Sequence, residues 1–361
     1  MNHEHLYNIN WEAFAALAPE AKSRYLVRAD GNPFHTLFAH QFDRAELDQL
    51  INLANAIRQI AKTRAGSCFL RELMTHKRAM LFFTQPSSRT FLSFLSACQI
   101  LGVQTGEVRD TTTSSEFKGE SREDSVRTFS SYFDLIVMRS EEKGLAERMA
   151  WVLSNSERPI PIINAGSGKD EHPTQALLDI YTLCRSFERS GGLRNRTVVF
   201  CGDLARGRTV RSLSRLLLNF DNIRQIFVAP PCLQIGDDIL KMLKKSNVEY
   251  AVMDDLRKAI PEADAVYMTR IQDEWDEKRG ESAAIDTSRF VFGLEELALL
   301  RPQGIIMHPL PRRDEIAVEV DRDPRAMYWR QMRNGMWIRT ALIAQTFCSA
   351  ERIHDYFNQN M

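Results

Sequence analysis

The chain has few cysteines, and their spacing suits neither a metal site nor a disulfide framework. Six cysteines are scattered over 361 residues, and several lie within apolar runs. Paired spacings of the kind that bind zinc are missing. We therefore expect reduced cysteines that pack in the interior, and no metal site.

The chain also lacks an excess of charge and a long apolar run. Lys plus Arg number 47 and Asp plus Glu number 47, so the formal net charge is zero. A neutral chain has no global field that would attract nucleic acid or an anionic membrane. The apolar runs are too short to span a bilayer, and residues 1–10 are polar, without the apolar core of a signal peptide. We therefore expect a cytoplasmic protein without nucleic-acid or membrane partners, in which any affinity for anions is local.

What remains is an alternation of short apolar strands with helical segments. Length and a hydrophobic content of 44% favour two domains. Residues 108–127 are polar and predict a loop, and residues 1–33 show no clear pattern. Strands are expected at residues 79–83, 135–138, 160–163, 197–201, 225–229, 250–253, 265–268 and 304–307. This predicts an α/β protein with two domains, each a mainly parallel sheet flanked by helices, and an active site between them.

The stretch from Ala79 to Phe94 predicts a strand, a turn and a helix. Pro86 ends the strand, and hydroxyl groups then lie where the first helical turn has unpaired N–H groups. Arg89 adds a planar guanidinium suited to phosphate, so the turn fits an anion site. Ser and Thr are also ordinary helix N-caps, so a plain helix start remains open on this motif alone.

Further polar clusters follow other predicted strands. His172 and Gln175 are three residues apart at a strand-to-helix turn, so both can face one ligand. Arg139, the segment 270–272 and the segment 307–312 each follow a strand, at the edge where open parallel sheets bind ligands. Residues 202–209 do not have the glycine spacing of a dinucleotide site, and their two arginines suit a carboxylate better.

With these motifs in view, the chain resembles the aspartate/ornithine carbamoyltransferase family from about residue 35 to its end. The family's phosphate signature Ser-Thr-Arg-Thr-Arg appears as residues 87–91, in the form Ser-Ser-Arg-Thr-Phe. His-Pro-Thr-Gln is intact at residues 172–175, and His-Pro-Leu-Pro-Arg at residues 308–312.

The resemblance implies a role for each matching residue. Catalytic roles fall to Arg89, Thr90, Arg139, His172 and Lys118. Carbamoyl phosphate would contact Ser87, Ser88, Arg89, Thr90, Ser114, Lys118, Arg139, His172, Gln175, Leu310 and Pro311. The aspartate carboxylates would be bound by Arg208, Arg270 and Gln272, with a backbone contact from Leu310.

The implied reaction is carbamoyl transfer from carbamoyl phosphate to the α-amino group of L-aspartate, a step of pyrimidine biosynthesis that needs no cofactor. The implied domains are a carbamoyl-phosphate domain at 34–174, joined by a C-terminal helix at 338–361, and an aspartate domain at 184–327. Residues 1–33 are an extension. The resemblance also implies a homotrimer in which Ser114 and Lys118 serve a neighbouring subunit, with regulatory or other pathway chains as possible further partners.

Three positions depart from the family pattern, and two other functions stay open. Gln85, Phe91 and Phe117 stand where the family has a glutamate, an arginine and a lysine, so some charge at the site is missing. These losses leave room for a non-catalytic homologue that scaffolds a partner enzyme. Another acceptor is the second alternative, but Pro309 stands where ornithine enzymes have a cysteine, and Arg208 and Arg270 would repel the ammonium group of ornithine.

Overall fold

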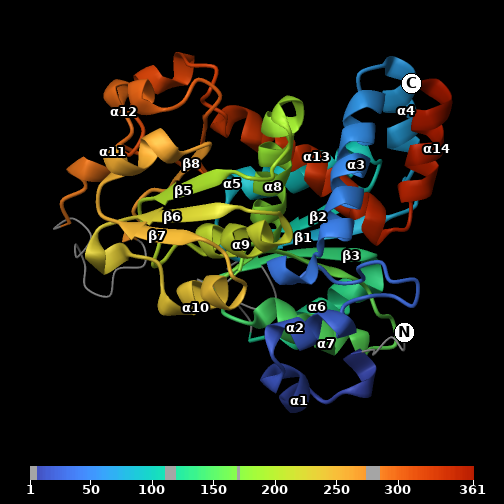
Figure 1. Cartoon of the computed structure of the whole chain (residues 1–361). Helices are drawn as coiled ribbons and strands as arrows, with labels where there is room; N and C mark the ends of the chain where they lie inside the picture. Colours follow the sequence, from blue (N-terminus) through green and yellow to red (C-terminus); the bar gives the residue numbers. More distant parts are fainter. Residues whose placement is uncertain (1–5, 110–118, 169–170, 274–284) are drawn as a thin grey trace. The chain divides into compact units, whose positions relative to one another are not determined.

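The computed structural model describes residues 6–109, 119–168, 171–273 and 285–361. The chain divides into two compact units: unit 1 comprises residues 1–177 and 335–361, and unit 2 comprises residues 178–334. Each unit is built on one parallel sheet with flanking helices (Figure 1). The predicted fold class of two parallel-sheet domains is therefore confirmed.

Unit 1 contains four parallel strands in the order β2-β1-β3-β4. Their bounds are β1 (Arg78–Phe83), β2 (Gln104–Val108), β3 (Leu135–Ser140) and β4 (Ile162–Ser167). The sequence did not predict β2, because this edge strand is exposed or half-buried and therefore polar. The predicted loop at 108–127 was wrong at its end, where α6 (Arg122–Tyr132) begins with Ser121 as its N-cap.

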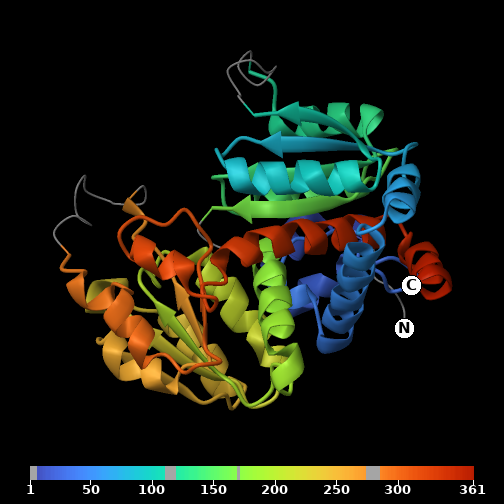
Figure 2. The ribbon, with the colours of Figure 1, turned by 90° about the horizontal axis from the view of Figure 1, so that it is seen from above.

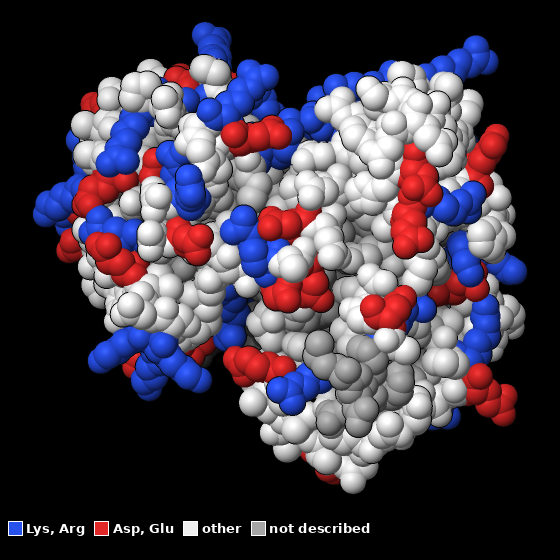
Figure 3. Space-filling model, turned by 45° about the vertical axis from the view of Figure 1, so that its right-hand side comes forward, with Lys and Arg blue, Asp and Glu red and all other residues white. Residues whose placement is uncertain are grey.

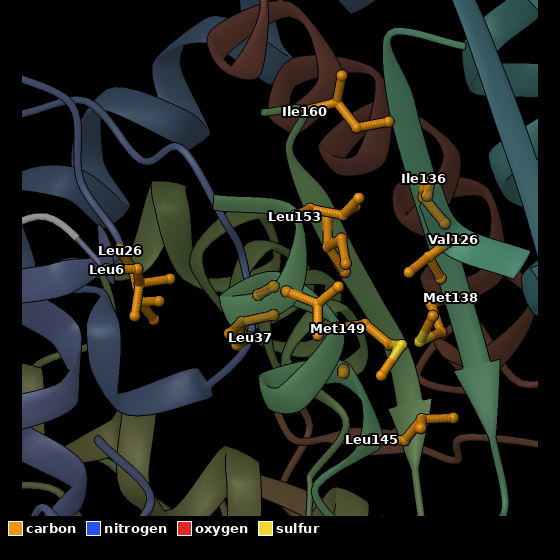
Figure 4. Close-up of a cluster of buried hydrophobic side chains, with 14 of the residues drawn as sticks. Leu6, Leu26, Leu37, Val126, Ile136, Met138, Leu145, Met149, Leu153 and Ile160 are labelled. Carbon is orange, nitrogen blue, oxygen red and sulfur yellow. The ribbon is translucent and has the colours of Figure 1, made fainter. Parts of the chain in front are cut away.

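The two faces of this sheet are covered by different parts of the chain. Side chains alternate along a strand, so Met80 and Phe82 point to one face and Phe83 to the other. The first face packs on α6 and on α7 (Leu145–Ser154), in the buried cluster of Figure 4. On the second face, Phe83 meets Phe91 of α5 (Ser88–Ile100) edge-to-face at 5.5 Å. Figure 2 shows α5 lying along the strands of unit 1.

The N-terminal extension is part of the same core. It contains α1 (Trp11–Ala16) and α2 (Pro19–Lys22), and Phe14 is fully buried in the cluster on α7. The Trp151 indole N–H donates to the carbonyl of Ile9 at 2.8 Å, and Lys22 pairs with Glu147 at 2.6 Å. Residues 6–33 are therefore a packed layer of unit 1.

Unit 2 contains five parallel strands in the order β7-β6-β5-β8-β9. They are β5 (Thr197–Cys201), β6 (Arg224–Val228), β7 (Tyr250–Met253), β8 (Ala265–Met268) and β9 (Ile305–Met307), close to the predicted ranges. One face packs on α11 (Leu256–Ala259) and α12 (Leu294–Leu299). On the other face, the rings of Phe200 and Phe227 stack at 5.4 Å. Helices α9 (Arg208–Leu216) and α10 (Asp237–Lys245) complete the unit.

Two helices belong to both units. Residues 173–177 of α8 (Pro173–Phe187) lie in unit 1 and the rest in unit 2, whereas α13 (Tyr328–Thr346) begins in unit 2 and ends in unit 1. The predicted C-terminal helix at 338–361 is instead the end of α13 followed by α14 (Ala350–Asn360).

The helix α4 (Arg64–Glu72) follows α3 (Arg44–Ile60), which starts at a capping box between Asp43 and Glu46.

Composition predicted a chain without an excess of charge and cysteines that pack in the interior. On the face shown in Figure 3, acidic and basic side chains are interspersed. Of the helices that the structure describes, none is long and apolar enough to cross a membrane. Cys98 and Cys201 are buried, and burial raises the pKa of the Cys98 thiol to about 12. Cys68, Cys232 and Cys348 are exposed, so the expectation of packed cysteines was wrong for these three.

Candidate active site

The turn after β1 presents the predicted anion site of unit 1. Its helix, α5, begins at Ser88 with Ser87 as the N-cap, and the Ser87 side chain makes no capping hydrogen bond within the described structure. Ser88 and Arg89 are exposed, whereas Thr90 is buried. The turn therefore offers a helix N-terminus with hydroxyl groups and a guanidinium beside it, the combination that binds a phosphate group.

Arg139 ties this turn to the next strand. The backbone N–H of Thr84 donates to the Arg139 carbonyl at 2.9 Å, and Phe83 pairs with Arg139 in the sheet. The guanidinium is nearly buried and donates through Nη1 to the Ala165 carbonyl at 3.1 Å, beside the end of β4. Residues from three neighbouring strand ends are thus held together at one edge of the sheet.

His172 contacts Arg139 directly. Its Nε2 lies 3.3 Å from Arg139 Nη1, and both side chains are buried. Because a guanidinium can only donate, His172 Nε2 is the acceptor, and the proton of the neutral ring lies on Nδ1. If His172 donates a hydrogen bond to a ligand, it therefore does so through Nδ1.

Gln175 completes this part of unit 1. Its backbone N–H donates to the His172 carbonyl at 3.0 Å as α8 begins, and its side chain is buried. The preceding turn is fixed by Asn164, which accepts from Gly166 N–H at 2.8 Å and donates to Ser167 Oγ at 3.1 Å. The predicted residues 87–90, 139, 172 and 175 thus all lie at the carboxyl edge of the unit 1 strands.

Phe91 is one of the three positions that depart from the family pattern, and the structure shows an arginine beside it. Phe91 is buried, and the Arg109 guanidinium lies over its ring at 4.3 Å. The arginine that the family has at position 91 is therefore absent here, but the exposed Arg109 lies over the phenylalanine ring that replaces it. Ser114, Phe117 and Lys118 lie outside the described residues.

In unit 2, Arg208 is the first residue of α9, after the turn that follows β5. Buried Asp203 organises this turn, accepting from Arg206 N–H at 3.0 Å and from Gln272 N–H at 3.1 Å. The Arg206 side chain also donates to the Gln272 carbonyl at 3.3 Å. Asp203 thus joins the end of β5 to the segment after β8, so that the predicted carboxylate-binding residues share one edge of the sheet.

Arg270 follows β8, as Gln272 does, and its side chain is largely buried. Its Nη1 donates to the Ile271 carbonyl at 2.9 Å and lies 3.7 Å from Asp273. Asp273 is in turn paired through both oxygens with Arg313, at 2.8 and 3.0 Å. Asp273 thus lies between two arginines, and the always-charged Arg270 guanidinium places a cation at this edge of the sheet.

The third strand end of unit 2 holds the predicted backbone contact at Leu310. The Leu310 N–H donates to His308 Nδ1, and His308 Nε2 donates to Glu315, both at 2.7 Å. Leu310 has a φ of 56°, a left-handed conformation that is costly for leucine, and the next peptide bond, to Pro311, is cis. The bonds of His308 hold the segment in this conformation.

The charge states of this pair follow from its hydrogen bonds. Burial lowers the pKa of His308, and Arg270 and Arg312 lower it further, although Glu315 opposes them. Burial alone would raise the pKa of Glu315, but the hydrogen bond from His308 lowers it overall. A neutral imidazole beside an ionised carboxylate agrees with the acceptor role of Nδ1.

The sequence did not reveal the structural roles of Asp203 and His308. A single aspartate after a strand is a weak signal, because the same residue type commonly caps a helix or forms a turn. His308 belonged to a recognised motif, but its bond to Leu310 depends on the folded loop. Among the described residues, no group of three or more His, Cys, Asp or Glu side chains could hold a metal ion.

Comparison with known proteins matches both units to one family. The carbamoyl-P binding domain of aspartate/ornithine carbamoyltransferase matches residues 35–185, and its Asp/Orn binding domain matches residues 194–346. The chain is 42% identical to the chloroplastic aspartate carbamoyltransferase of Arabidopsis thaliana, over 84% of this chain and 75% of that protein. It is 41% identical to the Vibrio cholerae aspartate carbamoyltransferase catalytic subunit, over 86% and 95%.

Solved structures agree with this match. Trypanosoma cruzi aspartate transcarbamoylase in complex with carbamoyl phosphate is 35% identical, covers 86% of this chain and 94% of its own, and has a TM-score of 0.77. The catalytic subunit of M. jannaschii aspartate transcarbamoylase is 33% identical, covers 91% and 100%, and has a TM-score of 0.76. The chain therefore belongs to the aspartate/ornithine carbamoyltransferase family.

Proposed function

We propose that this protein transfers the carbamoyl group of carbamoyl phosphate to the α-amino group of L-aspartate, giving N-carbamoyl-L-aspartate and phosphate. The observation that carries the proposal is the buried Arg139–His172 pair beside the turn at 87–90. It combines hydrogen-bond donors for a carbonyl oxygen with a site for a phosphate group. Relatives at about 40% identity that are named aspartate carbamoyltransferase support it.

In the proposed reaction, the aspartate amine attacks the carbonyl carbon of carbamoyl phosphate. The carbonyl oxygen gains negative charge, the bond to the phosphate oxygen then breaks, and the amine loses a proton. Donors from Thr90, Arg139 and His172 Nδ1 would stabilise that charge in the transition state. Ser87, Ser88 and Arg89 would bind the departing phosphate, and Gln175 and the 310–311 backbone would contact the carbamoyl group. The Leu310 backbone would also contact aspartate.

Unit 2 would bind the second substrate. Arg208, Arg270 and Gln272 lie along one sheet edge, and the two arginines match the two carboxylates of aspartate. Ornithine would instead bring an ammonium group to this cationic surface. Holding both substrates in reacting positions removes the entropy cost of their encounter.

The finer parts of the assignment are also proposals. Ser114 and Lys118 would complete a neighbouring subunit's site in a homotrimer, and the reaction would serve pyrimidine biosynthesis. Regulatory or other pathway chains are further candidate partners, since the Vibrio relative is named a catalytic subunit. Location in the cytoplasm stays a prediction, because the Arabidopsis relative is named chloroplastic.

A direct assay tests the function. Phosphate release from carbamoyl phosphate is measured with aspartate, ornithine, putrescine or oxamate as the acceptor. Of these four acceptors, only aspartate should give rapid release. The Arg89→Ala variant should lose at least ~10²-fold in turnover, because it removes a charged donor to the leaving group. Equal release with another acceptor, or none with aspartate, would contradict the proposal.

A further inference from the structure

A chain of buried hydrogen bonds in unit 2 ends at the Leu310 backbone. Asp179 of α8, which is fully buried, accepts from Gln331 Nε2 of α13 at 2.6 Å. Gln331 Oε1 in turn accepts from the His308 backbone N–H at 2.9 Å. His308 then accepts from Leu310 N–H. The chain therefore connects two helices to the loop after β9.

The carboxylate determines the orientation of the Gln331 amide. Asp179 Oδ1 accepts from Gln331 Nε2, so the carboxyl group faces the NH2 end of the amide. The oxygen of Gln331 then faces His308 N–H, which can only donate. A flipped amide would place oxygen against the carboxylate and NH2 against an N–H group, and both bonds would be lost. At 1% exposure, Gln331 has no access to bulk water that could replace them.

We propose that Asp179 and Gln331 are positioning residues for the carbamoyl-transfer reaction, holding His308 and thereby Leu310 in the conformation that binds substrate. The inference rests on the proposed function. Leu310 has a left-handed backbone that a leucine does not adopt without support, and the described contacts supply that support through His308. Neither residue touches substrate in this scheme.

The test compares variants that do and do not release Gln331. Gln331→Met removes the acceptor for His308 N–H, and Asp179→Leu removes the group that orients Gln331. Each should raise the half-saturating aspartate concentration at least about tenfold, equivalent to about 1.4 kcal/mol of binding. The dissociation constant for inorganic phosphate should stay unchanged, because its proposed site is the turn of unit 1.

Two matched controls keep the Gln331 amide oriented. Tyr267 donates its hydroxyl to the other oxygen of Asp179 at 2.8 Å, so Tyr267→Phe also loses a buried hydrogen bond to this carboxylate. Asp179→Asn can accept from Gln331 with its oxygen and donate to Tyr267 with its nitrogen. Both should change the half-saturating aspartate concentration by less than about threefold, although Tyr267→Phe should lower the melting temperature about as much as Gln331→Met.

The outcomes separate the inference from the proposed function. If the unaltered protein releases no phosphate with aspartate, the proposed function fails. If it is active and Gln331→Met binds aspartate normally, the positioning role alone fails. An equal loss of aspartate binding in Gln331→Met and Tyr267→Phe would also overturn that role, since the effect would then follow general stability. Should Asp179→Leu not fold, the Gln331→Met and Tyr267→Phe comparison decides.

Discussion

At the scale of single residues, position 91 combines a loss with a compensation. The family arginine is replaced by a phenylalanine that packs on Phe83, yet the Arg109 guanidinium lies over the new ring. Phe91 follows Thr90 directly, so we expect the charge of Arg109 to act on a phosphate group bound at the proposed turn. From the sequence motif alone, this position shows only the loss of a cation.

We expect Arg109→Gln to raise the half-saturating carbamoyl phosphate concentration about two- to fivefold with nearly unchanged kcat. An exposed cation near a dianion contributes only on the order of 0.5–1 kcal/mol, and salt screens it. Steady-state kinetics at low and high ionic strength check both statements. Arg71→Gln, a change at an exposed arginine of α4, is the control. Equal shifts in the two variants would show that Arg109 has no special role.

The site also shows which residues a sequence can and cannot reveal. Ser87 to Thr90 and His172 to Gln175 are short continuous motifs, so their residue types and strand-end positions were visible. The contact between Gln331 and Asp179 joins residues 152 apart, and each residue alone is an ordinary polar side chain on a helix. Their pairing exists only once α8 and α13 pack in unit 2.

At the scale of elements, strands buried on both faces were predictable because they are continuous apolar runs. The edge strand β2 was not, since its Gln-Thr-Gly-Glu-Val sequence has no such run. Residues 6–33 were missed for another reason: their apolar residues are sparse, and Leu6, Phe14 and Leu26 meet only when the segment folds over α7. The layer is recognisable from its burial and not from its periodicity.

We expect Phe14→Ala to lower the free energy of unfolding by about 3–5 kcal/mol, the usual cost of emptying a buried phenylalanine site. Chemical denaturation measures the change. Tyr7→Ala, in the same extension but 61% exposed, should change it by less than about 0.5 kcal/mol. Similar small effects in both variants would mean that the extension does not contribute to the core in solution.

At the scale of the whole molecule, buried histidines link stability to pH. His35 accepts from Ile162 N–H at 3.0 Å and hydrogen-bonds Ser154 at 2.9 Å, and burial together with Arg28 lowers its pKa to about 3. In the unfolded chain its pKa is about 6.5. Between these values the unfolded state binds the extra proton, so stability is complete above pH ~6.5 and falls as the pH decreases.

His35→Asn should therefore make the stability less dependent on pH. The asparagine oxygen can accept from Ile162 N–H without titrating. Urea unfolding from pH 7.5 to 5 should show a slope that is shallower than that of the unaltered protein by up to about 1.4 kcal/mol per pH unit. His308, whose pKa is also lowered, remains in both proteins and contributes equally. Identical slopes would show that His35 is not held neutral.

Assembly is tested by mixing two inactive chains. In the proposed homotrimer, Lys118→Ala chains alone or His172→Ala chains alone should be nearly inactive, because every site has the same defect. After verified subunit exchange at equal amounts, about a quarter of all sites should combine an intact Lys118 with an intact His172 of the next chain. No recovery of activity would rule out a shared site.

The division of the chain also has a consequence for its synthesis. Unit 2 is one continuous stretch, so a ribosome has delivered all of it once residue 334 emerges. Unit 1 needs residues 335–361 as well: Arg339 donates to Ser93 at 2.8 Å, and Arg28 donates to the Thr346 carbonyl at 2.6 Å. Unit 1, which is translated first, is therefore completed last. During translation, the α5 surface around Phe94 stays uncovered until the end of α13, with Arg339, has been synthesised.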